Sequence, residues 1–146
     1  MSYTNLLYHI VYGTKSRAPF ITSELKSDLH GYLGGIVRGL GGVPIEINGM
    51  AEHVHLLVRI RPTISVADFL SKLKSNSSGW AKRKTGRRFA WQTKYGAFTV
   101  SESQVTRVRS YIQNQEEHHR KISFEEEFEA LLKGNRIDFD PQYLWT

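Results

Sequence analysis

Two histidines separated by one valine, in the stretch MAEHVHLLVRI (residues 50–60), are the first candidates for chemistry. Residues 53–60 are rich in apolar and β-branched types and predict a strand, in which positions i and i+2 project to one face. His53 and His55 therefore point the same way, with Cβ atoms roughly 6–7 Å apart, and both can reach one cation. The alternative is a pair of partly buried histidines, each satisfied by a carbonyl.

A second candidate lies in the segment VTRVRSYIQNQEEHH, residues 105–119. Apolar residues at helical spacing form a stripe that faces the core. Tyr111 and Gln115 are four residues apart, so they share a face at the edge of that stripe, where a phenol can meet solvent or substrate. The alternative is that Tyr111 is an ordinary edge residue of an amphipathic helix and that Gln115 is a polar surface residue.

Together the two segments predict metal-assisted chemistry on a phosphate ester. Two neutral imidazoles and an amide oxygen would bind a divalent ion without neutralising its charge, and such an ion polarises a phosphate oxygen. A phenol with its ordinary pKa of about 10 is a poor nucleophile. It needs positioning and a Lewis acid to attack a phosphodiester, and this arrangement supplies both.

The elements that must position these residues follow the order strand, helix, strand, strand, helix, strand, helix, helix. Capping-box patterns predict helix starts at SVAD (65–68), SESQ (101–104) and SFEE (123–126). This order predicts an α+β fold: a ferredoxin-like βαββαβ sandwich with an antiparallel sheet, a C-terminal tyrosine-bearing helix and a short final helix. The predicted strands are 3–13, 43–49, 53–60 and 97–101; the predicted helices are 22–40, 65–84, 101–119 and one from 123; the tail is predicted as loop.

Length and composition favour a single domain, residues 1–146, with a net charge of +6 and no cysteine. The absence of cysteine excludes disulfides, thiolate metal sites and a cysteine nucleophile. We see no signal peptide and no apolar run long enough to span a bilayer, so we expect a cytoplasmic protein.

Charge is divided along the chain: residues 69–101 contain no Asp or Glu, whereas eight of the fourteen acids follow Tyr111. A basic middle region indicates a surface for a polyanion, and aromatic residues between the basic ones suit base stacking. The alternatives are a solvated mixed-charge surface and aromatic residues buried as anchors of a loop. The candidate DNA-binding residues are Lys72, Lys74, Lys82, Arg83, Arg87 and Arg88.

Three segments carry a resemblance to a known family. HVHLLV (53–58) resembles the histidine–hydrophobe–histidine (HUH) motif of single-strand DNA nucleases. YIQNQEEHH (111–119) resembles the tyrosine helix of the single-tyrosine HUH transposases of bacterial and archaeal insertion sequences, a group that includes REP-associated relatives. The opening YHIVYGTKSRAPFI is similar to their first strand and its loop.

This resemblance implies a role for each matching residue. Tyr111 would be the nucleophile that forms a 5′-phosphotyrosine and frees a 3′-OH. His53, His55 and Gln115 would bind Mg²⁺ or Mn²⁺. The implied partners are hairpins in single-stranded DNA at the ends of a mobile element, and a second copy of the chain, in a homodimer whose active sites combine residues of both subunits. The implied location is the cytoplasm of a bacterium or archaeon.

Other interpretations stay open at this point. A domesticated, repeat-associated relative would use the same nicking chemistry without a mobile element. A non-catalytic nucleic-acid-binding module of ferredoxin-like fold would keep the basic region, and a plain structural domain would need neither feature. His118 could touch phosphate or the surroundings of the metal, or form with His119 a pair at a helix C-terminus. Glu52 could orient His53 or simply belong to the turn.

Overall fold

A four-stranded antiparallel sheet forms the centre of the computed structural model, which describes residues 2–145. The strands are β1 (Leu6–Gly13), β2 (Val43–Met50), β3 (His53–Ile60) and β4 (Gly96–Thr99), in the spatial order β2-β3-β1-β4. The chain is therefore an α+β protein with the predicted βαββαβ order. The first strand begins at Leu6 rather than at residue 3, because pairing with β3 starts there, between Leu6 and Ile60.

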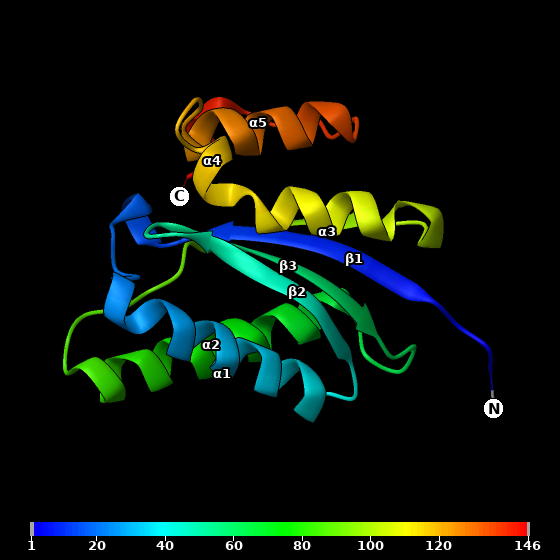
Figure 1. Ribbon diagram of the computed structural model, residues 1–146, viewed down its shortest axis with the longest axis horizontal. Coiled ribbons are helices and arrows are strands. Elements are labelled where there is room, and N and C mark those ends of the chain that lie inside the picture. Colours follow the sequence, from blue (N-terminus) through cyan, green and yellow to red (C-terminus); the bar gives the residue numbers. More distant parts are fainter. Residues whose placement is uncertain (1, 146) are drawn as a thin grey trace.

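Two long helices, α1 (Ser23–Gly39) and α2 (Val66–Thr85), cover one face of the sheet (Figure 1). Each begins at a predicted cap, since the side chain of Thr22 accepts from Leu25 N–H and that of Ser65 accepts from Asp68 N–H. Their apolar stripes meet the side chains of alternate β3 residues, Val54 and Leu56 among them, in the larger hydrophobic core.

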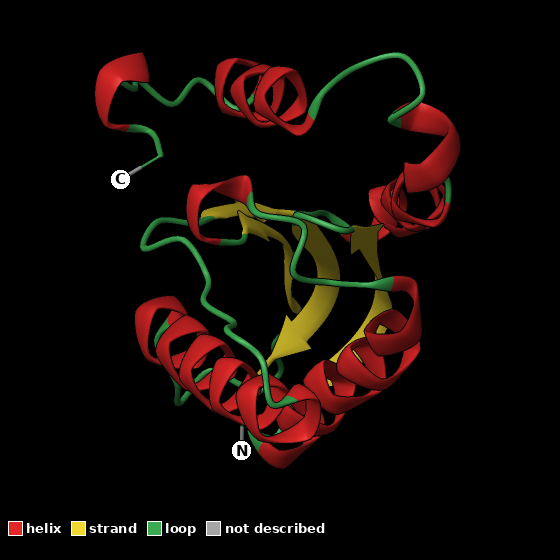
Figure 2. Cartoon of the chain, turned by 90° about the vertical axis from the view of Figure 1, so that its left-hand side faces the viewer, coloured by secondary structure: helices red, strands yellow, loops and turns green. Residues whose placement is uncertain are grey.

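The opposite face of the sheet carries the short helices α3 (Val105–Gln113), α4 (Gln115–His118) and α5 (Phe124–Gly134), as Figure 2 shows from the side. On this face His53 and His55 alternate with the core-facing residues of β3, as the period of a strand requires. A smaller hydrophobic cluster, which includes Val11, Phe98 and Phe128, joins α5 to the sheet. The two histidines thus lie between the sheet and a second helical layer.

The predicted continuous helix over 101–119 is wrong. Ser101 makes no capping hydrogen bond, residues 102–104 form a 3-10 turn, and the helix that follows is interrupted at Asn114, where φ is −95° and ψ is 24°. The interruption has a local and a tertiary contact. Asn114 donates its own side-chain amide to the carbonyl of Ser110 at 2.9 Å. Asn48 of β2 donates its amide to the carbonyls of Ile112 and Gln113, at 2.9 and 3.2 Å, and so takes acceptors at the end of α3.

The final helix begins as predicted, with a complete capping box between Ser123 and Glu126. The tail differs from the predicted loop, because Pro141–Tyr143 form a 3-10 turn (η3) and the ring of Trp145 packs on Phe124 and Phe128. The tail therefore helps to fix α5 over the sheet. Within residues 2–145, the helices are too short or too polar to span a bilayer.

Candidate active site

His53 and His55 are fully buried on the face of β3 that lies under α3 to α5. Their rings are 5.1 Å apart, and the ring of Phe124 from α5 stacks on His53 at 4.1 Å. Burial on this face follows from the strand period, which sends both side chains toward the second helical layer. The paired imidazoles are therefore enclosed by protein, and Phe124 fixes the plane of one of them.

The last turn of α3 and the start of α4 bring Tyr111 and Gln115 to the same place. Gln115 Oε1 lies 3.0 Å from His53 Nε2, and the Tyr111 ring lies 5.7 Å from the ring of His55. Gln115 is buried and Tyr111 is partly exposed. One chain thus assembles all four predicted residues, with the phenol at the border of the cluster and the amide inside it.

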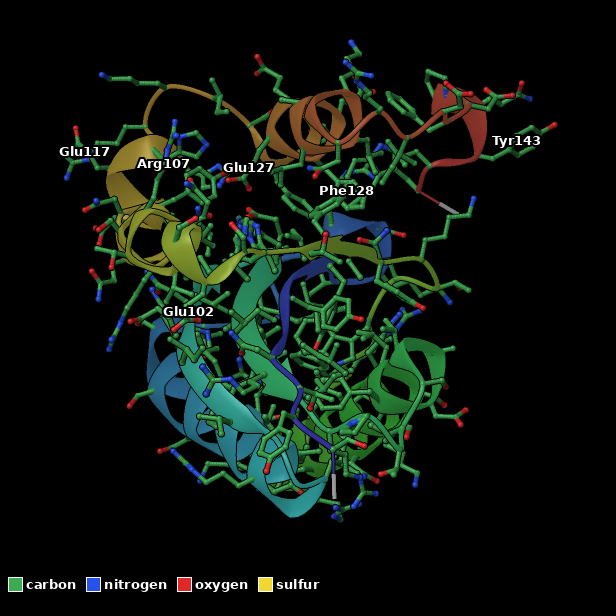
Figure 3. The ribbon with its side chains drawn as sticks, turned by 90° about the vertical axis from the view of Figure 1, so that its right-hand side faces the viewer. Glu102, Arg107, Glu117, Glu127, Phe128 and Tyr143 are labelled. Atoms are coloured by element: carbon green, nitrogen blue, oxygen red, sulfur yellow. The ribbon has the colours of Figure 1, made fainter. Side chains whose placement is uncertain are left out.

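Glu127, His119 and His9 complete the cluster. Sequence reasoning missed Glu127 and His9, and it considered His119 only as part of a pair at a helix C-terminus. Glu127 of α5 is 1% exposed; its Oε1 lies 2.9 Å from His55 Nε2 and 3.1 Å from His119 Nε2. A signal existed, since Glu127 interrupts the apolar stripe of α5, and a charged residue on such a stripe needs a partner. Figure 3 shows Glu127 and Phe128 on α5, on the side that faces the rest of the chain.

The Nδ1 atoms of His53, His119 and His55 each contact a partner. His53 Nδ1 lies 2.6 Å from Glu52 Oε1, and His119 Nδ1 lies 3.0 Å from the carbonyl of Ile122. Both partners are acceptors, so Nδ1 carries a proton in each ring. When the ring is neutral, its Nε2 therefore has a lone pair and no proton. His55 Nδ1 contacts His9 Nε2 at 2.8 Å, where either ring can donate.

Acceptor atoms therefore converge on one point. The Nε2 lone pairs of His53 and His119 face Gln115 Oε1, which is oriented because the amide nitrogen of Gln115 donates to Glu127 Oε2 at 3.2 Å. Ligand atoms of His53, His55, His119 and Glu127 all lie within 4.8 Å of one another. Nitrogen and oxygen lone pairs that face one another repel, so this arrangement requires either an added proton or a cation between them. Neighbouring ligands at right angles around an ion, with bonds of about 2.1 Å, are about 3.0 Å apart, so the donor set fits a divalent metal.

The electrostatics of the cluster agree with a metal site. Burial lowers the pKa of His55 to about 4 and that of His9 to about 3, so both rings are neutral near pH 7. Burial alone would raise the pKa of Glu127, but hydrogen bonds from His119 and His55 outweigh it and hold the pKa well below its usual range. His119 can donate this bond from Nε2 only in its protonated form, and although burial lowers its pKa, the hydrogen bond to Glu127 raises it overall. A bound cation would take the place of that proton. Neutral imidazoles and an ionised carboxylate are the forms that bind metal.

Tyr111 is neutral and hydrogen-bonded. Its hydroxyl donates to Glu127 Oε2 and lies 3.4 Å from His118 Nε2. Burial, together with the neighbouring carboxylate, raises the pKa of the phenol above its usual range. Beside it a cavity of about 650 Å³ extends between α3 and α5, lined by His9, Arg107 and Tyr111 among others. The phenol is thus reachable by a molecule that enters this cavity.

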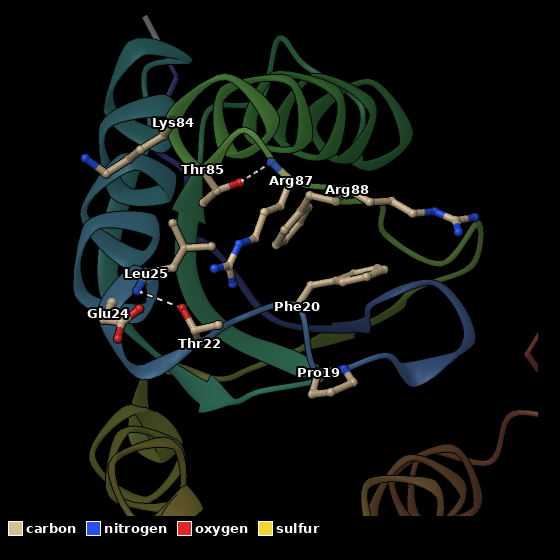
Figure 4. Close-up of a pocket in the computed structure, with 10 residues that line it drawn as sticks. Pro19, Phe20, Thr22, Glu24, Leu25, Lys84, Thr85, Arg87 and Arg88 are labelled. Carbon is tan, nitrogen blue, oxygen red and sulfur yellow. Dashed lines mark hydrogen bonds between the residues drawn. The ribbon is translucent and has the colours of Figure 1, made fainter.

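Five of the six candidate DNA-binding residues are exposed on α2 and on the loop that follows it. Arg87 and Arg88 border a cavity of about 490 Å³ between the start of α1 and the end of α2, beside Phe20 (Figure 4). Lys74 is different: its ammonium donates to the carbonyls of Gln92 and Thr93, and burial lowers its pKa to about 8. Lys74 therefore fastens the loop to α2.

The aromatic residues of the basic region are mostly anchors. Phe89 and Trp91 are 1% and 8% exposed, and Trp80 stacks on Tyr32 of α1 at 4.5 Å. The indole N–H of Trp91 donates to Ser77 at 2.9 Å. Because buried rings cannot accept a stacked base, the alternative of loop anchors holds for Phe89 and Trp91.

Comparison with known proteins adds an independent finding. The family model described as "Transposase IS200 like" matches residues 2–115. The ISDra2 transposase TnpA of Deinococcus radiodurans is 29% identical over 117 residues, covering 75% of this chain and 84% of the relative. The transposase for insertion sequence element IS200 of Salmonella typhimurium is 28% identical over 123 residues, covering 80% of each chain.

Solved structures agree with this likeness. A crystal structure of a protein from Deinococcus radiodurans, described as a transposase, superposes with a TM-score of 0.65 at 26% identity, over 78% of this chain and 93% of the other. A REP-associated tyrosine transposase bound to a REP hairpin gives a TM-score of 0.61 at 12% identity, over 82% of this chain and 72% of the other. At 12% identity the second likeness concerns the fold alone.

Proposed function

The chain belongs to the IS200-like transposase family, and from that premise we propose that it cleaves and rejoins single-stranded DNA through a covalent bond to Tyr111, with residues 1–146 acting as one HUH transposase domain. Membership of this family implies DNA endonuclease and strand-transferase activity in DNA transposition. The observation that carries the proposal is the position of the Tyr111 phenol, which reaches the paired histidines through one shared carboxylate, Glu127.

The roles of the residues follow from the contacts. His53, His55 and Gln115 would hold Mg²⁺ or Mn²⁺, and the ion, when bound, polarises a phosphate oxygen. The hydrogen bond from the phenol to Glu127 Oε2 keeps the Tyr111 oxygen beside the cluster and gives its proton an acceptor. Phe124 and α5 keep bulk water away from the imidazoles.

The covalent step balances without an external energy source. The Tyr111 oxygen forms a bond to phosphorus, the bond from phosphorus to the 3′ oxygen breaks, and that oxygen takes a proton to become a free 3′-OH. The product is a 5′-phosphotyrosine, in which the energy of the phosphodiester is conserved. Attack by a 3′-OH on this bond then rejoins DNA and restores the phenol of Tyr111.

The substrate we propose is single-stranded DNA with hairpins at the ends of a mobile element. A related fold has been solved with a REP hairpin bound, and the exposed residues Lys72, Lys82, Arg83, Arg87 and Arg88 offer positive charge for a duplex stem. The relatives come from bacteria, so we place the reaction in a bacterial cytoplasm.

The test is a denaturing gel with Mn²⁺ and labelled single-stranded DNA that carries the hairpins of the host element. Wild-type protein should give a covalent protein–DNA band, and Tyr111→Phe should give none while it still binds the hairpin. His53→Ala should give a weaker band because it binds the metal less well, and an unchanged metal dependence in this variant would contradict the ligand assignment. Cleavage by Tyr111→Phe would assign the nucleophile to another residue, and binding without any covalent band in wild type would leave a DNA-binding relative.

We also propose that two chains act together, because each chain has one Tyr111 and excision requires two cleaved ends. In the expected arrangement the tyrosine of one subunit serves the histidines of its partner, although a single chain also brings the two together. Mixing Tyr111→Phe with His53→Ala distinguishes these arrangements. Active sites shared between subunits restore the covalent band in mixed dimers, whereas sites built within one chain give no band.

A further inference from the structure

We propose that Glu127 and His119 bind the same ion as His53, His55 and Gln115, which makes a site of three imidazole nitrogens and two oxygens that takes Mn²⁺ in preference to Mg²⁺. This inference deepens the proposed function and rests on its metal site. Both residues lie beyond residues 2–115, the part that matches the family model. The C-terminal segment would therefore supply two ligands in addition to the HUH histidines.

His119 has the arrangement of a metal-binding histidine. Its Nδ1 proton is used by the carbonyl of Ile122 at 3.0 Å, and its Nε2 lies 3.0 Å from Gln115 Oε1 and 3.1 Å from Glu127 Oε1. Ligating histidines typically donate their second nitrogen to a carbonyl or a carboxylate, which orients the ring. Glu52 accepts from Nδ1 of His53 in this way, and the carbonyl of Ile122 accepts from Nδ1 of His119.

Glu127 uses its two oxygens for different partners. Oε1 lies 2.9 Å from His55 Nε2, 3.1 Å from His119 Nε2 and 3.4 Å from His53 Nε2, so it faces the point where the lone pairs meet. Oε2 accepts from the phenol of Tyr111 and from the amide of Gln115. One carboxylate thus connects the ligand cluster to the nucleophile and would fix the distance between them.

The charge of Glu127 also calls for a cation. The side chain is 1% exposed, and in residues 2–145 its ion-pair partners are all histidines. Two of them, His53 and His119, have a lone pair rather than a proton on the facing nitrogen when they are neutral. A buried carboxylate without a permanent positive partner is costly. A divalent ion at the shared point would compensate the carboxylate and satisfy the lone pairs together.

The donor set decides which ion is preferred. Mg²⁺ favours oxygen ligands and retains water, whereas imidazole nitrogen suits transition ions. Three imidazoles against two oxygens therefore favour Mn²⁺ over Mg²⁺. A site with only His53, His55 and Gln115 as ligands would have fewer protein donors and would discriminate less between the two ions.

The experiment measures Mn²⁺ binding directly on the full chain, from the EPR signal of free Mn²⁺ and with Mg²⁺ as competitor. Glu127→Gln removes the negative charge of one ligand, and His119→Gln replaces an imidazole nitrogen by a weaker amide oxygen. Each should weaken Mn²⁺ binding by about tenfold or more. Glu129→Gln, on the same helix, is the matched control and should bind like wild type. His53→Ala should lose binding in the same assay.

Wild-type affinity in Glu127→Gln or His119→Gln, with binding lost in His53→Ala, would overturn this inference and leave the proposed function intact. An absence of Mn²⁺ binding by the wild-type chain would overturn this inference, and the proposed function would then depend on a covalent band formed with Mg²⁺. If circular dichroism shows that a variant does not fold, Mn²⁺-loaded wild-type protein is measured instead. Electron–nuclear double resonance then counts the nitrogens that coordinate the ion. Three imidazole nitrogens support the inference, and two refute it.

Discussion

His9 is the residue through which β1 contributes to the site. It is buried, its Nε2 contacts His55 Nδ1 at 2.8 Å, and its ring lies 5.1 Å from the ring of His55. We infer that His9 binds no ion itself. It orients the ring of His55, which would bind the ion. Hydrogen-bond partners of ligating histidines have this role in many metal sites.

His9→Leu should therefore weaken Mn²⁺ binding by about 10- to 100-fold, because the His55 ring is no longer oriented by its hydrogen-bond partner. The measurement is a Mn²⁺ titration, with a thermal melt to verify folding. His30→Leu is the matched control. His30 lies on α1, beyond the opposite face of the sheet, and its replacement should leave the affinity unchanged. Equal affinities in the two variants would contradict an orienting role for His9.

At this scale, sequence reasoning finds residues whose spacing lies within one element. His53 and His55 share a strand face, so the strand period identifies this pair. Tyr111 and Gln115 were paired on the period of one continuous helix. They lie in α3 and α4, on either side of Asn114, and both still contact Glu127. Glu127 could not be placed, because its contacts cross 72 residues to His55 and 16 to Tyr111. Its one signal was a charge on the apolar stripe of α5.

The interrupted helix is the main lesson at the scale of elements. Periodicity over 105–119 is compatible with one helix, and the local signal for a break is weak: Asn114 is a residue type found at helix ends, and its amide donates to the carbonyl of Ser110 at 2.9 Å. Asn48 adds a long-range contact that the sequence does not reveal, because it reaches α3 from β2 and donates to two of its last carbonyls. The remaining elements were within reach of sequence reasoning, because their caps and their strand or helix periods are local signals.

Asn48→Ala tests this contact between elements. Removal of the amide leaves the carbonyls of Ile112 and Gln113 without their donor and should lower the free energy of unfolding by about 1–2 kcal/mol. Urea denaturation measures the loss, and hydrogen exchange should report faster opening at the end of α3. Asn76→Ala, at an exposed position of α2, is the control and should be close to neutral. Equal loss in both variants would show that Asn48 does not stabilise the end of α3.

For the whole molecule, the division of charge along the sequence becomes a division across the sheet. Residues 1–100 contain 14 Lys and Arg against five Asp and Glu, whereas residues 101–146 contain six against nine. The first part supplies the sheet and the layer of α1 and α2, and the second supplies the layer of α3 to α5 (Figure 1). Composition predicts this asymmetry, but only the fold assigns each charge to a side.

Arg88→Glu should weaken binding of a DNA hairpin and reduce the slope of log K against log salt by about one for each phosphate that the side chain had neutralised. Filter binding at several salt concentrations measures the slope. Lys133→Glu makes the same change in net charge on α5, across the sheet, and should leave the slope unaltered. A slope that is unchanged in Arg88→Glu would place the hairpin on another surface.

The same division bears on how a strand reaches Tyr111. The phenol belongs to the layer of α3 to α5, which as a whole carries more acids than basic residues, although Arg107 lines the cavity beside it. We therefore expect the basic side of the molecule to attract most of a polyanion. A strand tethered by a hairpin on the basic side is presented to Tyr111 at the effective concentration that its linker sets, and that concentration can exceed the bulk concentration many times over. If hairpins bind on the basic side, as proposed, we expect single strands without a hairpin to reach Tyr111 less often. The choice of substrate would then precede any contact between a phosphate and the phenol.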